Sequence, residues 1–200
     1  SEPSEQKLSS LIGHYHAGRS FEAEKLATSI TQEFPKNKVA LKVLAAVLKQ
    51  NGSINKALII CQKSVQLDPR DAEAHNNLGV LLQEQGRLKE AEESFKKAIA
   101  LKPDYAMAHG NLGMILQIQG KLKEAEESYK KAITLKPDYA EVHNNLGVIL
   151  KDLGKLGEAC SAFIQSINLN PNSSDTYANL AIVMRNLRFN SSNVKLYPLL

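Results

Sequence analysis

Four asparagines recur at one spacing along the chain and carry side-chain chemistry suited to holding another polypeptide. Each follows the last by 34 residues, and they are Asn77, Asn111, Asn145 and Asn179. Two of them are preceded by a second asparagine, Asn76 or Asn144. An asparagine amide has N–H donors and an acceptor oxygen, so it can pair with both the N–H and the C=O of an extended peptide. The row predicts a peptide-binding site that tolerates many peptide sequences.

The same period governs the residues that shape the backbone. They are Gly18, Gly52, Gly86, Gly120 and Gly154, then Ala23, Ala57, Ala91, Ala125 and Ala159, and Pro35, Pro69, Pro103, Pro137 and Pro171. Each period holds two segments with apolar residues at helical spacing. Glycine separates the segments, where a turn needs φ > 0, and proline ends the second. The sequence predicts helix pairs over 4–37, 38–71, 72–105, 106–139 and 140–173, and a terminal helix over 174–188.

Within a period the apolar and small residues follow a fixed order. In the third period they are His75, Leu78, Gly79, Leu82, Ala91, Phe95 and Pro103. This order resembles the tetratricopeptide repeat, and it returns in the next two periods. The resemblance implies an all-α fold over residues 4–188, a right-handed superhelical solenoid of antiparallel helix pairs. It also implies that the first helix of each pair lines the concave surface.

On that surface the asparagine row is similar to the asparagine ladder of O-GlcNAc transferase superhelices. Neighbouring first helices would lie about 8–10 Å apart. An extended chain rises about 3.3 Å per residue, so one asparagine would meet a bound peptide about every three residues. The alternative hypothesis is that repeat duplication copied these asparagines, each of which satisfies a local backbone group. Both hypotheses stay open from the sequence.

Charged residues at the groove positions bear on which kind of peptide the groove could bind. A second binding mode of the family, a clamp for the C-terminal carboxylate of chaperones, needs a cluster of positive charge that the equivalent positions lack. Glu73, Glu141 and Asp175 share one position of the first helices. They favour a peptide with basic residues if they face the groove, and otherwise complement the helix dipole.

The spacing of the histidines and cysteines does not favour a metal site or a nucleophile. His75, His109 and His143 fall on successive first helices, about 8–10 Å apart, whereas zinc ligands lie about 2.0–2.1 Å from one ion. We interpret them as packing residues, and likewise Cys61 and Cys160. The sequence contains no HExxH, no phosphate-binding glycine loop and no paired cysteine motif. We therefore predict no enzyme activity in this chain, no metal and no cofactor.

Composition argues against two classes of partner. The 25 Lys and Arg alternate with 21 Asp and Glu, which gives no basic stripe for nucleic acid. No apolar stretch approaches the roughly 20 residues of a membrane-spanning helix, and no signal peptide is visible at the start. The sequence predicts a cytoplasmic protein that binds neither nucleic acid nor membrane.

The C-terminal end departs from the repeat. Arg188 and Asn193 stand where glycine and alanine recur, and the tail 189–200 ends in an apolar segment. The tail could cap the last helix or begin a further domain, and the open end could pair with a second copy as a homodimer. We predict a protein-interaction scaffold that binds an extended peptide or partner segment in its concave groove. The alternative is the substrate-recognition region of a larger enzyme, such as a glycosyltransferase.

Overall fold

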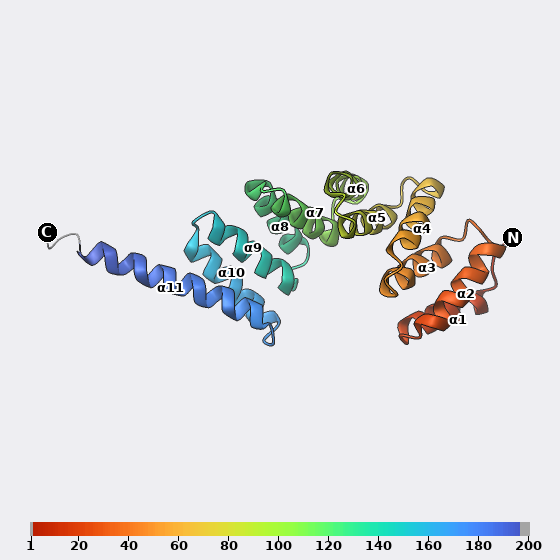
Figure 1. The fold of residues 1–200 in the computed structure, drawn as a ribbon, viewed down its shortest axis with the longest axis horizontal. Coiled ribbons are helices and arrows are strands. Elements are labelled where there is room, and N and C mark those ends of the chain that lie inside the picture. The colour runs from red at the N-terminus through yellow and green to blue at the C-terminus, as the bar shows by residue number, and fades with distance from the viewer. Residues whose placement is uncertain (1, 197–200) are drawn as a thin grey trace. The chain divides into compact units, whose positions relative to one another are not determined.

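The computed structural model describes the backbone of residues 2–196 and the side chains of residues 2–187. In that part of the chain the backbone forms helices and no strand (Figure 1), which confirms the all-α fold class. The helices are α1 Glu5–His16, α2 Ser20–Glu33, α3 Lys38–Gln50, α4 Ile54–Leu67, α5 Ala72–Glu84, α6 Leu88–Leu101, α7 Ala106–Ile118, α8 Leu122–Leu135, α9 Ala140–Asp152, α10 Leu156–Leu169 and α11 Ser174–Leu196.

The helices form two compact units, one ending at Pro103 and the other beginning at Asp104. In the first unit each helix from α1 to α6 packs on the next, and α1 also contacts α3. In the second unit the same holds from α7 to α11, and α9 also contacts α7 and α11. Because contacts run between successive helices, each unit is a stack of helix pairs, as the period predicts.

Each turn between the two helices of a pair contains the expected glycine. Gly120, between α7 and α8, has φ +74°, and its four counterparts have φ between +67° and +76°. The Gly120 N–H donates to the carbonyl of Gln117 at 2.9 Å, which satisfies an orphan carbonyl at the end of α7. The predicted need for φ > 0 is confirmed.

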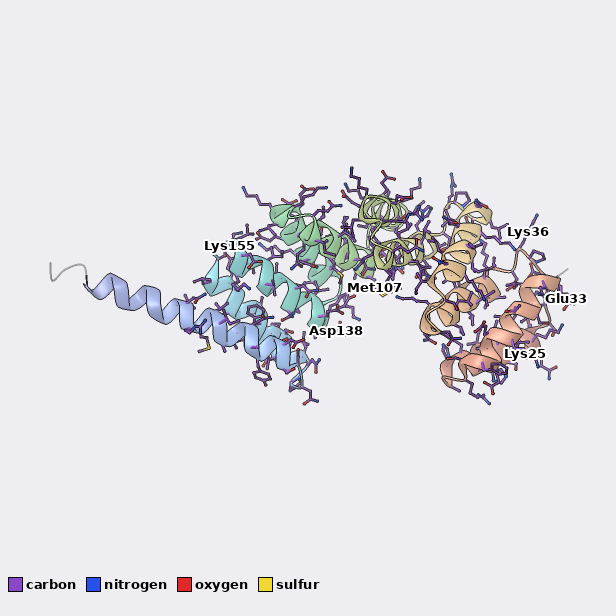
Figure 2. The ribbon with its side chains drawn as sticks, in the orientation of Figure 1. Lys25, Glu33, Lys36, Met107, Asp138 and Lys155 are labelled. Atoms are coloured by element: carbon purple, nitrogen blue, oxygen red, sulfur yellow. The ribbon has the colours of Figure 1, made fainter. Side chains whose placement is uncertain are left out.

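The core of each helix pair contains small and large residues. From the third pair to the fifth, a glycine of the first helix packs against an aromatic ring of the second helix. The alanine series is fully buried, and so are the aromatic rings of the third, fourth and fifth pairs, Phe95, Tyr129 and Phe163. A Cβ atom built on Gly79 would lie 2.6 Å from Phe95 Cε1. Only glycine therefore lets the two helices approach with the ring between them. Acidic and basic side chains mix outside this core, as Lys25, Glu33 and Lys36 show in the first unit (Figure 2).

The last helix differs from the expected one. We expected a helix end at residue 188 and a tail over 189–200, but the backbone of α11 stays helical to Leu196. Arg188 replaces the glycine that ends every other first helix, and no proline intervenes before Pro198, so nothing local stops the helix. Residues 197–200 of the expected tail lie outside the described part of the chain.

Candidate functional site

Three of the predicted asparagines are joined by their side chains in the second unit. Asn179 on α11 donates from Nδ2 to Oδ1 of Asn144 on α9 at 3.3 Å. Asn144 in turn donates from Nδ2 to Oδ1 of Asn145 at 3.4 Å. The structure thus brings Asn144, Asn145 and Asn179 together in one hydrogen-bonded strip across two first helices.

The strip continues to a buried phenol on the second helix of the preceding pair. Tyr129 on α8 is fully buried, and its hydroxyl donates to Oε1 of Gln117 on α7 at 2.9 Å. The Asn145 side chain also hydrogen-bonds to this phenol. Burial raises the pKa of Tyr129, helped by the nearby charge of Glu141, so the hydroxyl stays protonated and remains a donor.

The amides of the strip keep unused hydrogen-bonding capacity. A side-chain amide offers two N–H groups and two lone pairs. Within the strip, Asn144 and Asn145 each use one N–H and one lone pair, and Asn179 uses one N–H. All three residues are half-buried, so none of them is fully withdrawn from the surface.

The other predicted members differ in exposure. Asn77 on α5 is exposed and has no hydrogen-bond partner among the described residues. Asn111 on α7 is half-buried. Asn76 is only 4% exposed, so its amide is a packing element in the first unit and offers almost no surface to a ligand. The pairing of Asn76 with Asn77 in the sequence does not place both side chains on one surface.

The acidic position of the first helices is partly neutralised within the protein. Glu73 accepts from the ammonium of Lys42 at 2.7 Å, and Asp71 lies 3.1 Å from the same group. Partial burial lowers the pKa of Lys42, but hydrogen bonds to Glu73 and Asp71 outweigh that effect and the pKa rises. Lys42 therefore stays charged, and Glu73 adds little negative charge to attract a basic peptide.

The histidines have structural hydrogen bonds. Nε2 of His75 lies 3.1 Å from the carbonyl of Pro69, and Nε2 of His143 lies 2.9 Å from the carbonyl of Pro137. A carbonyl only accepts, so these Nε2 atoms carry the proton. Both rings are 9% exposed, which confirms the interpretation of His75 and His143 as packing residues. The described residues contain no group of three His, Cys, Asp or Glu that could hold a metal ion.

Two residues of the strip, Gln117 and Tyr129, were not predicted as site residues. A signal for them exists in the sequence, since Tyr129 is the one aromatic of its series with a hydroxyl, beside Phe95 and Phe163. A buried hydroxyl needs a partner. Repeat geometry would then point to the polar side chains of the helices on either side.

The stacked helix pairs define a helical repeat protein. A family model described as tetratricopeptide repeat matches residues 38–104 and 72–138, and a second model of that description matches 128–161. The chain belongs to the tetratricopeptide repeat family. No curated protein sequence matches it. No helix in the described part of the chain is both long and apolar enough to cross a membrane.

Solved structures of other proteins share this fold. A thermophilic TPR protein of Thermus thermophilus is 26% identical, with a TM-score of 0.71 over 90% of this chain and 97% of that one. Pseudomonas aeruginosa pilF is 21% identical, with a TM-score of 0.81 over 97% and 90%. YrrB, a TPR protein with an unusual peptide-binding site, is 23% identical, with a TM-score of 0.68 over 81% and 84%.

Proposed function

We propose that this chain is a protein-interaction scaffold whose row asparagines bind extended peptide segments in each unit. The observation that carries the proposal is the strip of Asn144, Asn145 and Asn179. It supplies amides of half-buried residues from two first helices, and each amide retains donors or acceptors for a further partner. Asn77 supplies an exposed and unpartnered amide in the first unit.

Hydrogen bonds to a peptide backbone suit this chemistry better than recognition of particular side chains. Every residue of an extended peptide except proline presents one N–H and one C=O. An amide that still has both a donor and an acceptor can meet both groups, whereas a lysine or a carboxylate can meet only one. The partner class is therefore an extended polypeptide segment bound with broad sequence tolerance.

The fold supports a scaffold role. Stacked helix pairs present extended surfaces that repeat proteins use to bind other polypeptides, and the same fold carries a peptide-binding site in YrrB. The low identity to YrrB transfers the fold and not its binding residues. The proposal assigns binding to this chain and no catalysis.

A peptide array tests the proposal in the second unit. The variant Asn111→Ala/Asn179→Ala removes two members of the row and leaves the contact between Asn145 and Tyr129 intact. Asn168→Ala is the matched control, because Asn168 is an exposed asparagine on a second helix, α10. We expect the double variant to lose broad peptide binding with its helical content unchanged, and the control to bind as the parent does. Equal binding by all three proteins would refute the proposal.

A further inference from the structure

In the third, fourth and fifth helix pairs, two positions of the repeat hold a glycine and a large aromatic ring that pack together. They are Gly79 and Phe95, Gly113 and Tyr129, and Gly147 and Phe163. In all three, a Cβ built on the glycine would lie 2.6 Å from the ring. In the second helix pair the same positions hold Ala45 on α3 and Cys61 on α4. The second pair therefore lacks the aromatic ring that its three successors contain.

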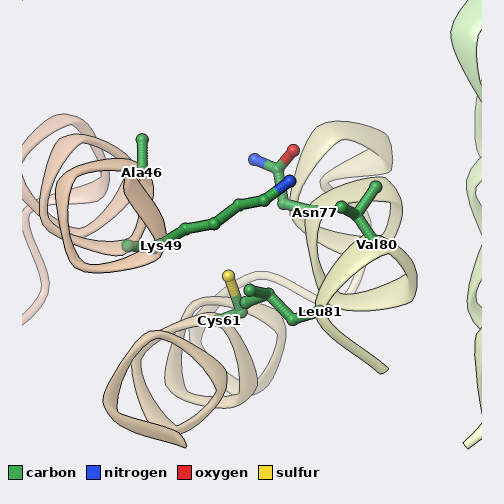
Figure 3. Close-up of a pocket in the computed structure, with 7 residues that line it drawn as sticks. Ala46, Lys49, Cys61, Asn77, Val80 and Leu81 are labelled. Carbon is green, nitrogen blue, oxygen red and sulfur yellow. The ribbon is translucent and has the colours of Figure 1, made fainter. Parts of the chain in front are cut away.

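A pocket lies in the first unit beside Ala45 and Cys61, where no ring is present. Its volume is about 150 Å³, and it is lined by Ala45, Ala46, Lys49, Cys61, Asn77, Val80 and Leu81. Figure 3 shows the Cys61 sulfur pointing into this space and Lys49 reaching from α3 toward Asn77 on α5. A cavity of about 150 Å³ accommodates a benzene ring in an engineered protein. We call this space the ring pocket.

The fourth helix pair shows what fits the equivalent space. Tyr129 occupies the position of Cys61, and its hydroxyl lies between Gln117 and Asn145. One repeat period is 34 residues, so two periods separate Gln117 from Lys49 and Asn145 from Asn77. The ring pocket thus has a thiol at the position where Tyr129 carries its ring, and two polar side chains where Tyr129 finds its partners.

The two polar groups at the mouth are available for a ligand. Asn77 is exposed and has no hydrogen-bond partner among the described residues. The Lys49 ammonium lies 2.9 Å from Oε1 of Glu84, an ion pair that restrains it near the mouth. An ammonium has three donors, so that ion pair leaves donors for another acceptor.

We propose that the ring pocket binds the side chain of a tyrosine in an extended peptide that Asn77 contacts in the first unit. The ring fills the space between Ala45, Cys61 and Leu81, and its hydroxyl hydrogen-bonds to Lys49 and Asn77. This inference rests on the proposed function and adds a preference for one side chain to otherwise sequence-tolerant binding. It makes Cys61 a specificity-determining residue through its small size.

Chemistry at the thiol is a weaker explanation of the pocket. Burial raises the pKa of Cys61 to about 12, although the charge of Lys49 acts in the opposite direction. A thiol with that pKa is neutral at physiological pH and is a poor nucleophile. The pocket therefore offers shape and hydrogen bonds rather than reactivity.

The first experiment uses the tyrosine side-chain analogue p-cresol on the full chain, with two-dimensional NMR spectra. We expect saturable shifts at Cys61, Asn77 and Leu81. Cys61→Ser keeps the cavity and should keep the shifts at Asn77 and Leu81. Ala45→Gly/Cys61→Tyr rebuilds the pair of the fourth repeat, fills the cavity and should abolish them. If that variant does not fold, Cys61→Leu fills the cavity without a ring. Absence of saturable shifts in the parent protein overturns the proposal.

The second experiment links the pocket to peptides. Tyrosine-containing peptides bound by the parent are compared with their Tyr→Ala and Tyr→Phe versions. We expect Tyr→Ala to weaken binding about tenfold or more, as for a buried aromatic anchor, and Tyr→Phe to weaken it less. In the filled-pocket variant the three peptides should bind alike. Equal binding to the parent overturns the pocket proposal while the asparagine row stands. Binding of p-cresol without any peptide binding limits the pocket to free phenols and overturns both proposals.

Discussion

Substituting Gly147 by alanine tests the contact that sets the spacing of the helix pairs. The new Cβ would lie 2.6 Å from Cε1 and 2.7 Å from Cδ1 of Phe163. Phe163 is fully buried, so its ring has little room to move away. The methyl group must therefore displace the ring or push α9 from α10.

Two effects of opposite sign determine the size of the change. Overpacking of a filled core costs roughly 1–3 kcal/mol. Alanine in place of glycine within a helix contributes roughly 1 kcal/mol in the other direction. We expect Gly147→Ala to lower the free energy of unfolding by about 1 kcal/mol, within a range of about 0–2 kcal/mol.

Gly13→Ala separates these two effects. Gly13 lies within α1, and a Cβ built there would meet no atom within 4 Å. Gly13→Ala should therefore show only the effect of the higher helix propensity of alanine, and stabilise the chain by up to about 1 kcal/mol. Repeat arrays depart from strict two-state unfolding, so the measurement is the shift in urea midpoint followed by circular dichroism.

A change of background makes the test stricter. Phe163→Cys alone removes the ring and should cost about as much as other large-to-small aromatic substitutions, roughly 3–5 kcal/mol. Adding Gly147→Ala to it reproduces the Ala45 and Cys61 pair of the second repeat. In that background the alanine should stabilise, so the sign of its effect should reverse. A destabilisation of the same size in both backgrounds would refute the assignment of the cost to the ring.

Three further predictions concern other contacts. Ala125→Leu should lower the melting temperature, because Ala125 is fully buried and overpacking there costs roughly 1–3 kcal/mol. A thiol reagent at pH 8 should modify Cys160 before Cys61, since Cys61 is buried with a pKa of about 12 and Cys160 is half-exposed; equal rates by mass spectrometry would contradict this. Hydrogen bonds to two lysines lower the pKa of Glu126, so its contribution is present above the unfolded pKa of about 4.3 and is lost as pH falls through the folded pKa. Glu126→Gln should therefore reduce the urea midpoint at pH 7 and change it much less near pH 3.

The sequence predicts those parts of the fold that are determined by one residue type recurring at the same position of successive repeats. Glycine at φ > 0, buried alanine and the close approach at Gly79 all follow from residue type and the 34-residue step. The end of α11 could not be predicted from register alone. Arg188 stands where the other first helices have their turn glycine, so the helix continues beyond the end at residue 188 that the repeat predicts.

The candidate site was only partly predictable. The positions of Asn77 and Asn145 follow from the period, but their hydrogen-bond partners depend on side-chain conformations that no period specifies. The ring pocket depends on a pair of substitutions, Ala45 and Cys61, each of which is ordinary alone. Such a pocket becomes visible only when both positions are compared with their equivalents in the other repeats.

Tyr129→Phe separates the structural and binding roles of Asn145. Phenylalanine already fills this position at Phe95 and Phe163, so packing should survive the change. The loss of the hydroxyl removes its bond to Gln117 and the contact with Asn145, which should cost about 0.5–1.5 kcal/mol of stability. The freed Asn145 N–H then becomes available to a peptide backbone. If Asn145 binds peptide, array affinity should be kept or increased despite the lower urea midpoint; a loss of binding would show that the phenol must hold the amide in place.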